Sequence, residues 1–164
     1  MRKFHTITAA AAAALLAAST AHGAANSNSC MLKGCAAGDK AVTYTSKTEP
    51  YFACPTRELS DYTLFVIGSV AFSAELSGKM PELSPVTGEP IYQGKTAEMM
   101  TTLRNAARVR TFDEAAAMCK RGRNKVRVTI LDAESGRSGS ARVREEKTGE
   151  TYWLPVSSLD KTSK

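Results

Sequence analysis

Cysteine is the residue type with the clearest capacity for chemistry in this 164-residue chain. There are four cysteines, Cys30, Cys35, Cys54 and Cys119. A cysteine thiolate is a nucleophile and a redox group, whereas two paired thiols form an unreactive structural disulfide. The role that applies depends on the compartment, because disulfides persist where the surroundings are oxidising. The chemistry of these four cysteines therefore depends on whether the protein is exported.

The first 23 residues have the pattern of a secretory signal peptide. Arg2 and Lys3 form a short basic head, and residues 6–18 form an uncharged, alanine-rich apolar run. Small residues follow up to Gly23, as a signal peptidase requires. The pattern predicts that residues 1–23 are removed and that the mature protein is periplasmic or secreted.

All four cysteines remain after this cleavage. An even number of cysteines in an exported chain predicts two disulfides and no free thiol. Three pairings are possible, and the sequence leaves all three open. The favoured one joins Cys54 to Cys119, because that bond would tie the two halves of the chain together. Cys30 and Cys35 would then close a short local loop.

Histidine is absent from the predicted mature chain, because His5 and His22 both lie in the signal peptide. Without histidine, the Ser-His-Asp and Cys-His catalytic arrangements and histidine metal sites are excluded. We therefore expect a protein that is not an enzyme and that holds no cofactor and no metal.

One segment retains an enzymatic interpretation. The sequence from Tyr51 to Thr56 places Cys54 at the entrance of an expected helix, where the helix dipole lowers the pKa of a thiol. This segment resembles the peroxidatic motif of peroxiredoxins, and the resemblance implies a redox-active thiol. That family has a threonine where Tyr51 stands, and an alternation of strands and helices that this chain lacks. A half-cystine at the start of a helix is the favoured interpretation.

Charge is distributed unevenly along the chain. The formal net charge is +6, and it becomes +4 when Arg2 and Lys3 are removed. Residues 24–103 carry six Lys/Arg against eight Asp/Glu, whereas residues 104–164 carry fourteen against eight. A basic half attracts an anionic partner over a distance. Outside the cytoplasm we expect this partner to be an envelope protein or an anionic cell-wall polymer, not nucleic acid. A solvated surface without a partner is the alternative.

The candidate binding residues lie on expected strands near the C-terminus. Alternation would send the odd-numbered residues of 125–131 and the even-numbered residues of 141–145 to one solvent face. An aromatic residue beside them would contribute to a ligand surface. The candidates are Arg123, Lys125, Arg127, Arg142, Arg144 and Tyr152.

Residues 24–95 are expected to form a helical region that ends in a linker. Residues 41–45 have the composition of one short strand. Apolar residues recur at helical spacing from Thr56 to Leu76, and Thr56 is a candidate N-cap. Residues 77–95 contain three prolines and three glycines, which favours a long loop or linker. The longest apolar stretch is nine residues, so we expect no transmembrane segment in the mature chain.

Residues 96–164 are expected to form helices that lead into a small sheet. One helix begins after Thr96, and a capping box at Thr111 opens a short helix that Gly122 ends. From Lys125 onward the apolar period changes to two, which predicts strands. The expected core of this sheet is Val128, Ile130, Val143, Trp153 and Leu159.

Residues 106–160 resemble a bacterial SH3-like domain. The segment from Trp153 to Leu159 matches the closing pattern of that family, in which an aromatic, an apolar residue and a proline are followed by three variable residues and then a leucine. Proline would end a strand, the serines favour a helical turn, and Leu159 returns to the core. A helix over residues 112–121 departs from the family, which has an extended loop there. The resemblance implies an α+β protein, with a helical N-terminal part packed on a small C-terminal SH3-like β-barrel.

Three functional hypotheses follow. The first is a non-catalytic SH3-like binding module of the bacterial cell envelope, which recognises a protein, peptide or anionic wall polymer. The second is a small disulfide-bonded inhibitor or exclusion-type factor that acts on another envelope protein. The third is a thiol redox enzyme that uses Cys54.

Overall fold

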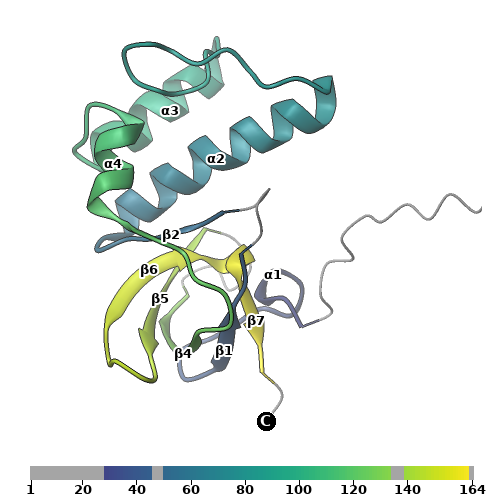
Figure 1. Ribbon diagram of the computed structural model, residues 1–164, viewed down its shortest axis with the longest axis vertical. Helices are drawn as coiled ribbons and strands as arrows, with labels where there is room; N and C mark the ends of the chain where they lie inside the picture. Colours follow the sequence, from purple (N-terminus) through teal and green to yellow (C-terminus); the bar gives the residue numbers. More distant parts are fainter. Residues whose placement is uncertain (1–27, 46–49, 134–138, 163–164) are drawn as a thin grey trace, which may run out of the picture.

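The protein is described by a computed structural model over residues 28–45, 50–133 and 139–162. The expected signal peptide, residues 1–23, lies outside the described residues. Figure 1 shows two layers, with a curved sheet below and the longer helices above it. The mixture of helices with an antiparallel sheet confirms the α+β class.

The main sheet has five antiparallel strands in the order β6-β5-β4-β1-β7. The two edge strands, β6 and β7, are not paired with each other, so the described strands form no closed barrel. The first strand comes from the region that was expected to be mostly helical, so the sheet draws on both ends of the chain. The strands are β1 (Lys40–Thr43), β4 (Arg127–Asp132), β5 (Ser140–Glu145), β6 (Thr151–Pro155) and β7 (Leu159–Lys161).

Alternation along β4 and β5 builds the core of the sheet. Ile130 pairs with Val143 across these strands, and both side chains are fully buried. Val128 and Leu159 are also fully buried, so four of the five expected core residues are confirmed. On the other face, Arg127, Arg142 and Arg144 are exposed, and Thr129 and Leu131 are partly exposed. The alternation of apolar and polar residues in the sequence therefore corresponds to a sheet with one apolar and one polar face.

Trp153 is the exception, and its placement in the core was wrong. Tyr152 pairs with Val143 on the inner face, and Leu154 also faces inward with no exposed surface. Trp153 lies between them and opposite Arg142, on the outer face, where it is partly exposed. Successive residues of a strand point to opposite faces, so only one of two adjacent aromatics can enter the core.

The end of the sheet follows the expected local chemistry. Pro155 ends β6, a 3₁₀ turn (η1, Val156–Ser158) follows, and Leu159 begins β7 with a fully buried side chain. Proline cannot donate a ladder hydrogen bond and ends the strand at this point.

Three helices form the upper layer: α2 (Arg57–Ser77), α3 (Lys95–Ala106) and α4 (Phe112–Met118). Thr56 caps α2 and Thr111 caps α4, each with its hydroxyl oxygen accepting a backbone N–H three residues later, at 3.3 Å and 3.1 Å. Both predicted capping residues are confirmed, whereas α3 begins at Lys95 and not after Thr96 as expected. A one-turn helix, α1 (Cys30–Lys33), lies beside β7.

The long loop between α2 and α3 contains a buried carboxylate, Glu89, that bonds to both helices. The side chain of Glu89 is 6% exposed; its Oε1 accepts a hydrogen bond from Tyr62 Oη at 2.8 Å, and Arg104 pairs with its other oxygen. Burying a carboxylate is unfavourable unless charge and hydrogen bonds compensate it, and here both are present. The loop is thereby attached to α2 and α3 together.

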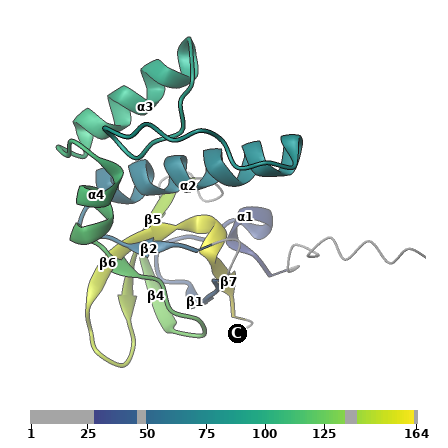
Figure 2. The same cartoon turned by 45° about the horizontal axis from the view of Figure 1, so that its top comes forward.

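The helical layer is an insertion between β1 and β4, and its two ends meet. Before α2, β2 (Phe52–Ala53) pairs antiparallel with β3 (Lys120–Arg121), which follows α4. The Cys54–Cys119 disulfide joins the same two segments. Figure 2 shows β2 passing close to β6 beneath the start of α2. Cys54 exchanges both backbone hydrogen bonds with Trp153 of β6, each at 2.8 Å.

All four cysteines are paired, as Cys30–Cys35 and Cys54–Cys119. The favoured pairing is confirmed. Two disulfides are consistent with an oxidising compartment. The short helix that was expected to end at Gly122 ends instead at Met118, because Cys119 leaves the helical conformation with φ −108° and ψ 158°.

The two disulfides are expected to contribute unequally to stability. Removing the Cys54–Cys119 bond with a double alanine variant should destabilise the protein by about 4 kcal/mol, because it closes a 65-residue loop in the unfolded chain. Removing Cys30–Cys35, which closes only five residues, should cost about 2 kcal/mol. Urea denaturation of both variants measures the difference. Equal losses, or a larger loss for the short loop, would contradict this order.

Leu154 and Trp153 form a matched pair for testing the strand register. Leu154→Ala should destabilise the protein by about 2–5 kcal/mol, because it empties a fully buried position. Trp153→Ala should cost less, since its side chain is partly exposed on the other face. If thermal denaturation gives the reverse order, the register of β6 is wrong.

Candidate anion-binding surface

Three of the candidate arginines lie on one exposed face of the sheet. Arg127 on β4 and Arg142 and Arg144 on β5 all point away from the core and are exposed. Arg144 lies between Thr129 and Thr151, whereas Arg142 lies between Asp132 and Trp153. The alternation in the sequence predicted this common face. We call Arg127, Arg142 and Arg144, with Lys40, the basic face.

Lys40 joins this face and was missed by the sequence analysis. It lies opposite Thr129 at the start of β1, and its Nζ donates to Thr129 Oγ1 at 2.7 Å and to Glu146 Oε1 at 2.6 Å. The pairing of β1 with β4 joins residues 89 positions apart. No local pattern in the sequence reveals that register.

The remaining candidates, Arg123 and Lys125, line a groove where β4 begins. This groove has a volume of about 480 Å³, and Arg127 forms part of its wall. We call it the basic groove; it is lined by Arg123, Lys125, Val126, Arg127, Glu145, Glu146 and Lys147. Four cations and two carboxylates give it a positive balance. It adjoins the basic face through Arg127, so five candidate cations belong to one continuous region.

The two carboxylates of the groove are both engaged by cations. Glu145 has a buried side chain, and Arg123 Nη2 donates to its Oε2 at 2.5 Å. The hydrogen bond from Lys40 lowers the pKa of Glu146, and the positive charges of Lys40 and Arg127 add to this effect. Arg123 therefore compensates a buried charge. Lys125 and Arg127 are exposed and, within the described part of the chain, form no ion pair, so their charges face solvent.

Tyr152 does not join the basic face, although it was a candidate for that surface. It points into the sheet and is 8% exposed. It lines a second cavity of about 150 Å³ with Tyr51, Arg121 and Arg123. Burial raises the pKa of the Tyr152 phenol well above its usual range, and the nearby Tyr51 and Glu145 raise it further. Tyr152 is consequently a neutral residue of the sheet's interior.

Gly122 has a role at this cavity that differs from the expected helix stop. A Cβ at this position would lie 2.5 Å from the ring of Tyr51, which is closer than any side-chain atom can approach. The Gly122 N–H donates to the Tyr51 carbonyl at 2.8 Å, and Tyr51 Oη donates to the Arg123 carbonyl at 2.9 Å. Tyr51 thus positions the segment that carries Arg121 and Arg123.

Cys54 is fully buried and bonded to Cys119 at the start of α2. In this form it offers no thiol at the helix N-terminus. Among the residues that the structure describes, no group of three or more cysteine, histidine, aspartate or glutamate side chains is placed to hold a metal ion.

A second groove lies in the helical layer and was not expected. Val66 and Val70 of α2 form one wall, and Met80 and Leu83 of the following loop form another. Its volume is about 960 Å³. The helical spacing of the apolar residues predicts one buried face along the whole of α2, but only the first half of the helix is buried. By length and composition α2 is apolar enough to cross a membrane, with 28% of its most apolar stretch buried. One such helix is weak evidence of a membrane span.

Comparison with protein-family models, with curated proteins and with solved structures finds no match.

Two buried phenols predict a loss of stability in alkali. Burial and the hydrogen bond with Glu89 raise the pKa of Tyr62, and burial raises that of Tyr152, each above an ordinary value of 10.0. The unfolded chain releases these protons at about pH 10, whereas the folded protein retains them. Their stabilising contribution is therefore complete below pH 10 and is lost as the pH rises further.

Tyrosinate absorbance and circular dichroism should be followed together during an alkaline titration. We expect part of the absorbance change to coincide with unfolding and to shrink in Tyr62→Phe and Tyr152→Phe variants. An absorbance change that is complete while the native circular dichroism persists would contradict this.

Proposed function

We propose that this protein is an exported, non-catalytic binding module of the cell envelope that recognises an anionic partner. The observation that carries the proposal is the gathering of Arg127, Arg142 and Arg144 with Lys40 on one exposed face. Exposed guanidinium groups bind carboxylates and phosphates with paired hydrogen bonds. A protein segment or a wall polymer that carries such groups is the partner we infer.

The spacing of these cations favours an extended polyanion. Arg142 and Arg144 are two residues apart on one strand, which corresponds to about 7 Å. Arg127 lies on the neighbouring strand, two residues beyond the partner of Arg144, which makes it a diagonal neighbour about 8 Å from Arg144. Anionic groups repeated along a chain at several ångströms can engage two or three of these cations together. Contacts made together strengthen binding beyond any single exposed ion pair, which is worth at most about 1 kcal/mol.

We interpret the sheet as SH3-like. The support lies in its last segment, where β6 ends at Pro155, a 3₁₀ turn covers Val156–Ser158, and Leu159 enters the core. The pairing of β1 with both β4 and β7 brings the first and last strands of the sheet together. In this interpretation residues 57–118 are a helical insertion between the first two strands.

The proposed location rests on two independent features. The signal-peptide pattern of residues 1–23 predicts export, and the two disulfides fit an oxidising compartment. A periplasmic or secreted protein meets cell-wall polymers and envelope proteins but not nucleic acid. The location therefore narrows the anionic partner to these classes.

The test is a charge reversal on the basic face. Binding of the wild-type protein to purified cell wall or to envelope extract should weaken about tenfold or more between low and physiological salt, because exposed charges are screened over about 8–10 Å. The double variant Arg127→Glu/Arg142→Glu should abolish binding while thermal denaturation stays close to that of the wild type. Salt-independent binding, or normal binding by the double variant, would contradict the proposal.

A matched control is available in the helical layer. Lys95 and Arg108 are exposed cations on or after α3, away from the sheet. The double variant Lys95→Glu/Arg108→Glu changes the net charge by the same amount and should bind as the wild type does. An equal loss in this control would assign the binding to net charge alone and not to the basic face.

A further inference from the structure

We propose that the groove of the helical layer docks an apolar segment of a partner protein that carries a basic residue at each end. We call this groove the apolar groove. It is lined by Pro50, Val66, Ile67, Val70, Ala71, Ala74, Glu75, Met80, Leu83, Ser84, Pro85, Gly88, Phe112 and Asp113.

One wall of the groove is an apolar face of α2 with the spacing of a helix face that packs against another element. Val66, Val70 and Ala74 recur at four-residue spacing on α2, which is the pattern of a buried helix stripe. Only Val66 is buried in the isolated protein. Glu89 holds the opposing loop in place through Tyr62 and Arg104, so the groove does not depend on a partner for its shape.

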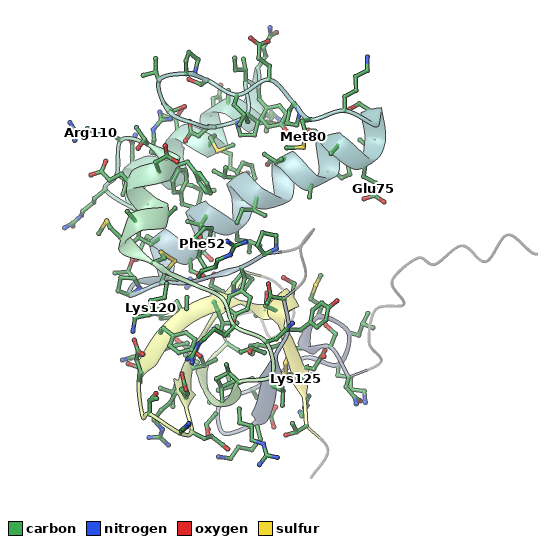
Figure 3. The ribbon with its side chains drawn as sticks, viewed as in Figure 1. Phe52, Glu75, Met80, Arg110, Lys120 and Lys125 are labelled. Atoms are coloured by element: carbon green, nitrogen blue, oxygen red, sulfur yellow. A yellow bond between two sulfur atoms is a disulfide. The ribbon has the colours of Figure 1, made fainter. Side chains whose placement is uncertain are left out.

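Two large apolar side chains of the loop line the groove and face solvent. Met80 is 67% exposed and Leu83 46%. Contiguous exposed apolar surface of this kind marks an interaction site in a monomer, because burying it is favourable. Figure 3 shows Met80 above the C-terminal half of α2 and Glu75 near the end of that helix.

The charges of the groove determine the kind of occupant. Among the described residues, Glu75 and Asp113 are the charged groups in its lining, and both are carboxylates. Glu75 lies at the C-terminal end of the α2 wall, and Asp113 lies in the first turn of α4. Carboxylates of this kind repel fatty acids and anionic lipid headgroups but attract lysine or arginine. An apolar peptide with basic ends complements both the lining and the charges.

The length of the groove sets the length of the segment. From Val66 to Glu75 the α2 wall extends about 14 Å, at about 1.5 Å per residue. A partner helix would cover this distance with about ten residues. The basic face of the sheet is a different surface, so occupation of the groove does not require the anionic partner. The two together would make the protein an adaptor between two partners.

The experiment uses two displayed peptide libraries with the same random apolar core of ten residues. One library has lysine at both ends, and the other has glutamate. Selection against the mature wild-type protein should enrich the lysine-ended library about three- to tenfold over the glutamate-ended one, the range that two exposed ion pairs provide. Equal enrichment, preference for glutamate ends, or no saturable binding would overturn the proposal.

Two variants and a control locate the binding. Ala71→Trp fills the groove from an exposed position of α2 and should abolish enrichment while the melting temperature is retained. Glu75→Lys should remove the preference for lysine ends. Glu98→Lys makes the same charge change on an exposed position of α3 outside the groove and should leave the preference intact. Enrichment that survives Ala71→Trp would show that the peptides bind elsewhere.

Two further measurements exclude other occupants. Sedimentation should show that Ala71→Trp and the wild type have the same oligomeric state, because the groove is not a contact between copies. The wild-type protein should not bind zwitterionic phosphatidylcholine vesicles. A wild-type dimer that Ala71→Trp dissociates, or vesicle binding that this variant abolishes, would overturn the proposal.

Discussion

The structure depends on the requirement that both ends of a long insertion return to the same edge of the sheet. The insertion, residues 57–118, lies between β2 and β3 in the sequence. These two-residue strands pair with each other at the base of the insertion. The Cys54–Cys119 disulfide covalently fixes the same point. Cys54 also exchanges two backbone hydrogen bonds with Trp153, so one residue connects the insertion ends to the edge of the main sheet. We call this junction the clasp.

The two layers take their relative position from the clasp and from a few buried contacts around it. α2 starts three residues after Cys54 and lies against β5 and β6. Ser140 Oγ donates to Ser60 Oγ at 2.7 Å between two fully or nearly buried serines. Because the first half of α2 is used in this contact, its second half extends beyond the sheet, and there the apolar groove lies. The basic face occupies the part of β4 and β5 that α2 leaves uncovered.

Local sequence patterns predicted the local structure well. Hydroxyl N-caps at Thr56 and Thr111 predicted the starts of two helices, because a side-chain oxygen satisfies backbone N–H groups that no helical partner reaches. The alternation around Val128 and Val143 predicted two strands and the face of their arginines. The turn after Pro155 was also predicted from residue types alone.

The features that the sequence missed depend on contacts between distant segments. Lys40 reaches the basic face through the pairing of β1 with β4, and more than 80 residues separate these two strands along the chain. The choice between Tyr152 and Trp153 for the core depends on strand parity, which two adjacent aromatics do not reveal. Gly122 has the sequence character of a helix stop, but the packing of Tyr51 against it is a tertiary contact. The apolar groove lies where α2 extends beyond the sheet. The helical spacing of apolar residues does not indicate where that point is.

Hydrogen exchange on a variant without the clasp disulfide tests this account most directly. In Cys54→Ala/Cys119→Ala, we expect the backbone amides of α3 and α4 to lose more protection than those of β4 and β5, whose loss is limited to the fall in global stability of about 4 kcal/mol. This result is expected because the sheet retains its own core and the helical layer loses the bond that closes it. Uniform loss of protection through both layers, or unchanged protection in α3 and α4, would contradict the central role of the clasp.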